Sequence, residues 1–435
     1  MSVQVIGAGL AGCEAAWQLA KRGIEVTLID MKPTKRTPAH TSAGFAELVC
    51  SNSLRSDRLS NAVGLLKEEM RQLDSLILRC ADATRVPAGG ALAVDRNAFS
   101  QRVTETIAAH PRIHVLSREV ARVPEREAIV ATGPLTSDAL AEDIARLPGL
   151  RTLCFFDAAA PIVSADSLNM ERVFRQSRYG RGDDYLNCPL TREEYKAFYE
   201  ALCAAEKAEV HGFDGQVFEG CMPIEVMASR GERVMAFGPM KPVGLVDPRT
   251  GREPYAVVQL RAEDERGSMY NLVGFQTRLK WGEQKRVFSM IPGLEHAEFL
   301  RYGVMHRNTF LHSPGFLDEN YQMIARPTVY FAGQMTGVEG YVESASSGLV
   351  AGIALARQLQ GKDPVDFGAQ TAIGALARHI SRENRDFQPM NANFGLIDPL
   401  ERRIRGKQER YLAMADRSLT LIEGLRCNPL ACDFD

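Results

Sequence analysis

The sequence lacks the features that mark several classes of protein. No apolar run approaches the ~20 residues that cross a bilayer, so we expect no membrane segment. Nine cysteines are present without one C-x-x-C pair, which argues against a structural zinc site, a dithiol redox centre or a disulfide framework and favours a reducing compartment. The 52 basic and 54 acidic residues leave a net charge of −2, so bulk charge indicates no nucleic-acid partner.

The composition that remains is typical of a soluble globular protein. Hydrophobic residues make up 45% of the 435 and charged residues 24%, and this length suffices for two or three domains. A glycine-rich motif already begins at residue 7, which leaves no room for a signal peptide. We therefore expect a cytoplasmic location, no membrane contact and no bound metal.

The chain begins with a pattern typical of a nucleotide-binding loop. Residues 3–12 read VQVIGAGLAG, a short apolar strand that runs directly into G-x-G-x-x-G. A helix is expected over 13–22, followed by a second strand over 24–29 that ends in an acid. Here the first glycine permits the tight turn, the second lets the backbone approach a pyrophosphate, and the third lets the helix pack on the strand. The predicted cofactor contacts are Gly7, Ala8, Gly9, Leu10, Ala11, Gly12 and, through the ribose hydroxyls, Asp30.

Two later segments extend this pattern. Residues 128–134 form an apolar strand that ends in Ala-Thr-Gly, and residues 329–334 form another strand that meets glycine before a long helix expected over 344–360. In flavoproteins with two dinucleotide folds, such strands return to the FAD sheet. The alternative is a glycine-rich turn in an unrelated α/β protein. The further cofactor contacts predicted from these segments are Thr132, Gly133, Gly333, Gln334, Gly337 and Gly340.

The spacing of these segments predicts a discontinuous domain. The expected fold is α/β, a Rossmann-like two-dinucleotide-fold FAD domain interrupted by an α+β insertion domain and followed by a helical C-terminal tail. The predicted boundaries are 1–187 and 301–361 for the two parts of the FAD-binding domain, 188–300 for the insertion and 362–435 for the tail. There is no second G-x-G-x-x-G, so a nicotinamide nucleotide is expected to bind transiently.

Three side chains suggest chemistry. Cys50 lies where an apolar turn gives way to small polar residues, and Cys221 lies between glycine and Met-Pro in a constrained turn. A cysteine is a nucleophile only as the thiolate, and a small buried hydrophobe is the competing interpretation. His306 lies among arginine, asparagine and aromatic residues that suit a planar heterocycle, although a structural histidine fits equally well.

Local charge is less even than the total. A cluster of four cations within residues 278–286 and a cation-rich part of the tail are both candidate phosphate contacts, and solvated helix faces would explain either. The cluster consists of Arg278, Lys280, Lys285 and Arg286. Against five acids, the tail gathers eight cations between residues 376 and 410, namely Arg378, Arg382, Arg385, Arg402, Arg403, Arg405, Lys407 and Arg410.

Ten stretches resemble the folate- and FAD-dependent tRNA (uracil-5-)-methyltransferase family. They span about residues 3–396 and include loops beyond the general flavoprotein patterns. Asp30 stands where this family more often has glutamate. The stretches are VIGAGLAG, AELVCSNSL, RVPAGGALAVDR, ATGPLTS, RYGRGDDYLNCP, FGPMKPVGLVDPRTG, LVGFQT, YGVMHRNT, GVEGYVESA and FQPMNANFGL.

The resemblance implies methylation of uridine 54 in the tRNA T loop. It implies 5,10-methylenetetrahydrofolate as carbon donor, reduced FAD as electron source and NAD(P)H to recharge the flavin. Cys50 and Cys221 match the family's two motif cysteines, one a nucleophile for uracil C6 and the other a base for the C5 proton. We assign Cys221 as nucleophile and Cys50 as base, with the reverse assignment open. His306 matches the histidine that stacks on the pterin.

Two alternative functions are kept. The sister family of FAD- and folate-dependent enzymes that modify the tRNA wobble uridine shares the FAD patterns but carries a longer C-terminal helical region. A plain NAD(P)H-flavin oxidoreductase would have no RNA partner. If the partner is tRNA, local basic patches must hold it, and the Arg-rich tail, with Arg402, Arg403 and Arg405, is the first candidate.

Overall fold

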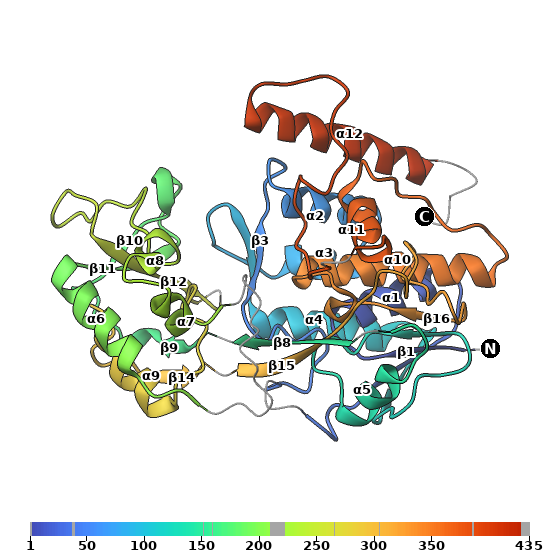
Figure 1. Cartoon of the computed structure of the whole chain (residues 1–435), viewed down its shortest axis with the longest axis horizontal. Helices are drawn as coiled ribbons and strands as arrows, with labels where there is room; N and C mark the ends of the chain where they lie inside the picture. The colour runs from blue at the N-terminus through green and yellow to red at the C-terminus, as the bar shows by residue number, and fades with distance from the viewer. Residues whose placement is uncertain are drawn as a thin grey trace.

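Two sheets of different construction divide the protein between them (Figure 1). The computed structural model describes residues 2–36, 40–150, 152–158, 160–208, 222–264, 266–303, 305–384 and 387–427, with only the backbone described in 152–158, 305–309 and at 427. A parallel five-stranded sheet has the order β16-β7-β1-β2-β6, and an antiparallel six-stranded sheet has the order β10-β11-β12-β13-β9-β14. The predicted fold class, a Rossmann-like α/β domain with an α+β insertion and a helical tail, is confirmed.

The parallel sheet forms from short apolar runs that are far apart in the sequence. Its strands are β1 (Val3–Ile6), β2 (Val26–Asp30), β6 (Ile113–Ser117), β7 (Ala128–Val130) and β16 (Val329–Phe331). Helices α1 (Leu10–Lys21) and α10 (Tyr341–Leu359) pack against each other beside it. A Cβ on Gly348 would lie 2.1 Å from the Ala11 carbonyl oxygen, so this crossing requires glycine. Helix α10 begins three residues before the predicted start because Gly340 directly precedes it.

The antiparallel sheet forms the unit on the left of Figure 1. Thr191 begins α6 with a capping box, in which its hydroxyl accepts from the amide of Glu194 and the Glu194 carboxylate accepts from the amide of Thr191. The strands are β9 (Ile162–Ser164), β10 (Phe174–Arg175), β11 (Tyr185–Leu190), β12 (Ala256–Ala262), β13 (Met269–Leu272) and β14 (Phe299–Arg301). The helices are α6 (Arg192–Ala204), α7 (Ile224–Ser229), α8 (Val234–Phe237) and α9 (Trp281–Phe288).

Two long strands connect the units. β8 (Thr152–Ala158) pairs antiparallel with β15 (Met305–Leu311) along their whole length, between the two sheets (Figure 1). The domain boundaries expected from the sequence remain predictions. Because β9, β10 and β11 belong to the antiparallel sheet, we propose that the second unit begins near residue 160 instead of 188.

Helices from the N- and C-terminal regions cover the remaining faces. Helix α12 (Lys407–Cys427) lies across α2 (Ala62–Gln72) at the top of Figure 1. The other elements are α3 (Leu76–Ala83), α4 (Arg96–Ala109), α5 (Asp138–Ala145), α11 (Ala372–Ser381) and a small sheet of β3 (Ser53–Ser56), β5 (Ala91–Val94) and β4 (Arg85–Val86). In the described part of the chain, no helix combines the length and apolarity that a membrane crossing requires.

Candidate active site and cofactor cradle

Three glycine-containing segments meet at one edge of the parallel sheet. β1, β7 and β16 are adjacent and parallel, so their carboxyl ends lie side by side. The amide of Ala131 donates to the carbonyl of Ile6 at 2.8 Å, and the amide of Ala332 donates to that of Val130 at 2.9 Å. The carboxyl edge of such a sheet is where α/β proteins bind dinucleotides. The fold therefore brings the three predicted cofactor segments together.

The first glycine loop has room for a phosphate. A Cβ on Gly12 would lie 1.8 Å from the carbonyl oxygen of Gly7, and Gly7 itself has φ +100° with Ala131 behind it. These two glycines are required by the fold. A Cβ on Gly9 would meet nothing within 4 Å, although its backbone angles suit any residue. The open space at the N-terminus of α1 fits a pyrophosphate, since free helix amides bind anions there.

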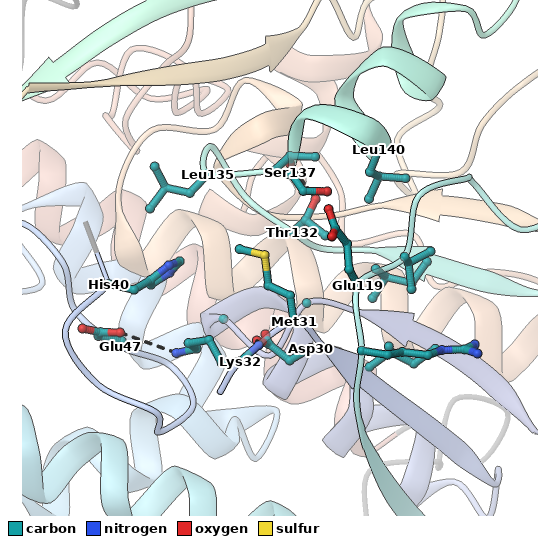
Figure 2. A pocket seen from close by; sticks show the side chains of 17 residues that line it. Asp30, Met31, Lys32, His40, Glu47, Glu119, Thr132, Leu135, Ser137 and Leu140 are labelled. Atoms are coloured by element: carbon teal, nitrogen blue, oxygen red, sulfur yellow. Dashed lines mark hydrogen bonds and ion pairs between the residues drawn. The ribbon is translucent and has the colours of Figure 1, made fainter. Parts of the chain in front are cut away.

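A cavity of about 640 Å³ extends from this loop past Asp30. Both Asp30 carboxylate oxygens accept backbone hydrogen bonds, from Ala8 at 2.6 Å and from Lys32 at 2.8 Å. Asp30 thus fixes the glycine loop and keeps further lone pairs for ligand hydroxyls. Figure 2 shows Thr132, Ser137 and Glu119 across the space from it. We refer to this space as the first cavity.

The late glycine segment shapes the approach to α10. The amide of Gly333 donates to the Ser347 hydroxyl at 2.7 Å, and the Gln334 side-chain amide donates to both oxygens of Glu339, at 3.1 and 2.9 Å. Gly337 has φ +90° and Gly340 has φ +116°, a region of backbone space that glycine alone adopts readily. A Cβ on Gly337 would lie 2.3 Å from the ring of Phe387.

A second cavity, of about 960 Å³, lies between the two units. Cys50, Gln334, Gly340 and Tyr341 line it from one side. Arg261, Asn271, Val273, Gly274 and Gln276 line it from the antiparallel sheet and the turn after it. Because both units supply its walls, this cavity exists only when they are docked together.

Cys50 is held by a phenol. The Tyr341 oxygen lies 2.9 Å from the Cys50 sulfur and accepts the backbone amide of Cys50 at 2.8 Å. Burial holds the pKa of Tyr341 well above its ordinary value, and the nearby Cys50 charge acts in the same direction. Tyr341 therefore stays a neutral phenol that can donate to the sulfur as well as accept from the backbone.

Three guanidinium groups support the loop around Cys50. Arg96 binds the carbonyl of Leu48 and Arg301 binds that of Val49 at 2.7 Å. Arg261 donates to the Ser51 hydroxyl at 2.7 Å and to the Asn52 side-chain oxygen at 2.9 Å. Burial lowers the pKa of Arg261 and of Arg301, and the Cys50 sulfur opposes that shift in both. Arginine stays charged even so, so these cations favour a negative sulfur at Cys50.

A fourth guanidinium lines the same cavity. Arg55 has φ +62° and pairs with the fully buried carboxylate of Glu343, which also accepts the amide of Ala392 at 2.9 Å. The backbone beside Arg55 is fixed by Lys67, whose ammonium donates to the carbonyls of Leu54 at 2.8 Å and Ser56 at 2.6 Å. Burial lowers the pKa of Lys67 to about 8.

The three candidate site residues from the sequence are described by the structure to different extents. Cys50 lies in the second cavity. Cys221 lies outside the described residues, and of His306 only the backbone is described, paired with Asp157 in the β8–β15 ladder. Sequence reasoning missed Tyr341, Arg55, Arg96, Arg261 and Arg301. One signal was available, because Arg261 is the charged residue in the otherwise uncharged strand AVVQLRA.

Metal ligands are not gathered anywhere in the described part of the chain. No group of three or more histidine, cysteine, aspartate or glutamate side chains there could hold an ion.

The fold and the two cavities define a dinucleotide-binding α/β protein with a cleft between two units. The family model described as "Glucose inhibited division protein A" (GIDA) matches residues 2–363. Proteins called methylenetetrahydrofolate--tRNA-(uracil-5-)-methyltransferase TrmFO are 62% identical in Pelotomaculum thermopropionicum and 60% identical in Bacillus licheniformis, covering 97% and 98% of this chain and 98% of each relative. The chain therefore belongs to the GIDA family and, within it, to the TrmFO family.

Solved structures agree with this fold. The GidA protein of Aquifex aeolicus superposes with TM-scores of 0.67 and 0.68 in two crystal forms, at 14% and 16% identity. The match covers 98% of this chain and 76% and 78% of the GidA chains. At this identity the likeness is one of fold alone.

Proposed function

We propose that the protein methylates C5 of uridine 54 in the T loop of tRNA, with 5,10-methylenetetrahydrofolate as carbon donor. The observation that carries this proposal is the 62% identity, over 97% of the chain, to a relative called methylenetetrahydrofolate--tRNA-(uracil-5-)-methyltransferase. The second cavity adds support, since it places a cysteine beside cations in a space large enough for a nucleobase and a pterin. The reaction is expected in the cytoplasm, without a metal.

The three glycine segments fit FAD. Gly9 and the N-terminus of α1 would hold the pyrophosphate, Asp30 and Thr132 the adenosine side, and the Gly333–Gly340 segment the side toward the second cavity. FAD in its reduced form would supply the two electrons that turn a transferred methylene into a methyl group, and NAD(P)H would restore them.

The cysteines would divide the remaining work. The Cys221 thiolate forms a bond to uracil C6, and the displaced electron pair moves onto the C5–C4–O4 system so that C5 can attack carbon. Cys50 as thiolate would then take the C5 proton, and the electron pair left at C5 would expel the nitrogen that carried the methylene carbon. Addition of a hydride to that carbon, with electrons that reduced FAD would supply, would return an electron pair to the ring and expel the Cys221 sulfur. The charges of Arg261 and Arg301 interact with the Cys50 sulfur and would favour the charged form that a base requires. His306 would stack on the pterin.

The described chain that follows Cys221 is bonded to a wall of this cavity. The described chain resumes at Met222, and two residues later the amide of Ile224 donates to the carbonyl of Gln276 at 2.7 Å. Gln276 lines the second cavity. The roles of the two cysteines nevertheless stay proposals, and the reverse assignment leads to a different experimental outcome.

Fluorinated substrate separates the two roles. A nucleophile that adds to C6 of 5-fluorouridine in tRNA stays covalently attached, because fluorine at C5 cannot leave as a proton does. We expect Cys221→Ala to lose both the adduct and turnover, and Cys50→Ala to lose turnover yet keep the adduct on denaturing gels. Cys203→Ala, an exposed thiol outside both cavities, is the matched control. An adduct that survives in Cys221→Ala and disappears in Cys50→Ala would reverse the roles.

Nucleoside analysis separates the alternatives. Unmodified tRNA incubated with methylenetetrahydrofolate and NAD(P)H should gain 5-methyluridine at position 54. A product at the wobble uridine would identify the sister activity, and flavin turnover without any tRNA product would leave a plain NAD(P)H-flavin oxidoreductase.

A further inference from the structure

A separate groove gathers positive charge near the C-terminal helix. It has a volume of about 960 Å³ and lies between residues 394–404 and the first half of α12. Its charged lining consists of Arg402, Arg403 and Arg410 with a single acid, Glu401, and Tyr411 also lines it. We call this space the basic groove. The side chains of Arg402, Arg403 and Arg410 are exposed to solvent.

The groove is a fixed feature of the fold. The rings of Phe394 and Tyr411 stack with centroids 4.2 Å apart and planes 15° apart. The Arg417 guanidinium on α12 donates to the carbonyl of Pro399 at 2.9 Å, which ties the loop to the helix. The helix in turn is anchored on α2, where the Ser418 hydroxyl donates to the buried carboxylate of Glu69. The cations are therefore displayed on a rigid frame.

Its cations are available to a ligand. Arg402, Arg403 and Arg410 form no ion pair with any carboxylate in the described part of the chain. The competing cluster at 278–286 differs, since Lys280 lies 2.6 Å from Glu206 and Arg286 lies 2.6 Å from Glu283. Arg278 also lies 3.9 Å from Glu225. Neighbouring acids thus neutralise most of the second cluster and leave the groove positive.

The groove borders the second cavity through a short stretch of chain. Asn391 lines the second cavity, and the next residue, Ala392, is fixed to Glu343 of α10 by its amide. Phe394 already lines the groove. Three residues span about 10 Å at most. One short segment of chain therefore lines both the groove and the second cavity.

We propose that the basic groove binds the phosphate backbone of the tRNA substrate and holds it so that one nucleotide reaches the second cavity. The proposal rests on the proposed function, which supplies the RNA. Guanidinium groups suit this task because they bind phosphate oxygens in pairs.

The test replaces Arg402, Arg403 and Arg410 with glutamate together. Binding of an unmodified tRNA transcript is followed by fluorescence anisotropy across salt concentrations, with FAD content and NAD(P)H reduction of the flavin measured on the same samples. We expect affinity to fall about 10- to 100-fold at moderate salt and the slope of log affinity against log salt to shrink by about 2 to 3. The KM for tRNA should rise while kcat stays close to that of the unaltered protein.

The matched control is the triple change of Lys280, Lys285 and Arg286 to glutamate, which alters net charge equally at exposed side chains on α9 and its N-cap. Binding weakened equally in both variants would mean a bulk charge effect and overturn the proposal. If the unaltered protein binds and methylates tRNA while the groove variant keeps the same tRNA affinity, the groove proposal fails and the proposed function stands. An unaltered protein that binds no tRNA would overturn the proposed function as well. If the groove variant loses binding to phosphatidylglycerol vesicles and keeps its binding to tRNA, the groove contacts a membrane surface and the proposal is rejected.

Discussion

Main-chain atoms shape the glycine loop of the first cavity, whereas side chains from both units surround Cys50 in the second. In the first cavity the decisive groups are glycine Cα atoms, helix amides and the two backbone bonds to Asp30. In the second, Arg261 and Tyr341 hold Cys50 from segments more than 200 residues away in the sequence. Main-chain sites follow from local sequence, while side-chain sites depend on how distant elements dock.

The largest expected effect tests the main-chain cavity. Gly12→Ala would place a Cβ 1.8 Å from the Gly7 carbonyl oxygen, which requires the backbone to move and should cost several kcal/mol of stability, about 3 or more. Gly9→Ala has open space and permissive backbone angles, so the apoprotein should melt like the unaltered one yet bind FAD at least about 10-fold more weakly. Thermal melting and flavin absorbance measure both. Equal FAD binding in Gly9→Ala would show that the pyrophosphate does not approach this loop.

The second prediction concerns the side-chain cavity. Arg261→Met removes the guanidinium near Cys50 and its bonds to Ser51 and Asn52. We expect methylation to slow by about 100-fold, since oriented charges at a reacting group are worth that much, while FAD stays bound. Alkylation of Cys50 by iodoacetamide should slow in parallel. Arg266→Met, at an exposed position after the same strand, is the control. If Cys50 is alkylated at the normal rate while methylation is slow, Arg261 acts by positioning the substrate and not through the thiol.

The smallest effect is a pH dependence away from both cavities. Glu69 accepts the amides of Ala372 and Ile373, and burial raises the pKa of its carboxyl to about 7 against these bonds. The folded protein then holds a proton that the unfolded chain releases from about pH 4.5 upward. The free energy of unfolding, relative to Glu69→Gln, should therefore fall by about 3 kcal/mol at most as the pH rises from 4.5 to 7.

Urea unfolding of the two proteins at several pH values measures this difference. The glutamine variant has no charge at this position, so every other titrating group cancels in the comparison. A difference that stays constant from pH 5 to pH 8 would mean that Glu69 is ionised throughout, held so by the N-terminus of α11.

The sequence predicted the first region well and the second only in part. The strands, the glycine loop and the adjacency of the three cofactor segments follow from local patterns, and the structure confirms the fold they imply. Cys50 was found by its motif, but Tyr341 and Arg96 have no signature that relates them to a thiol far away in the chain. Their relation to it comes from the docking of α10 and α4. The predicted roles of Cys221 and His306 remain predictions.

The contacts around residues 48–52 couple the conformation of the Cys50 loop to the docking of the two units. Arg96 joins Glu263 at 2.7 Å, Asn52 donates to the carbonyl of Ala262 at 2.9 Å, and Arg301 reaches back to Val49. Separation of the two units would leave these charged and polar groups without their partners in a poorly hydrated interface. This would cost several kcal/mol. The conformation of the loop that carries Cys50 and the docking of the two units are consequently cooperative. A molecule whose units have separated therefore also lacks an ordered Cys50 loop.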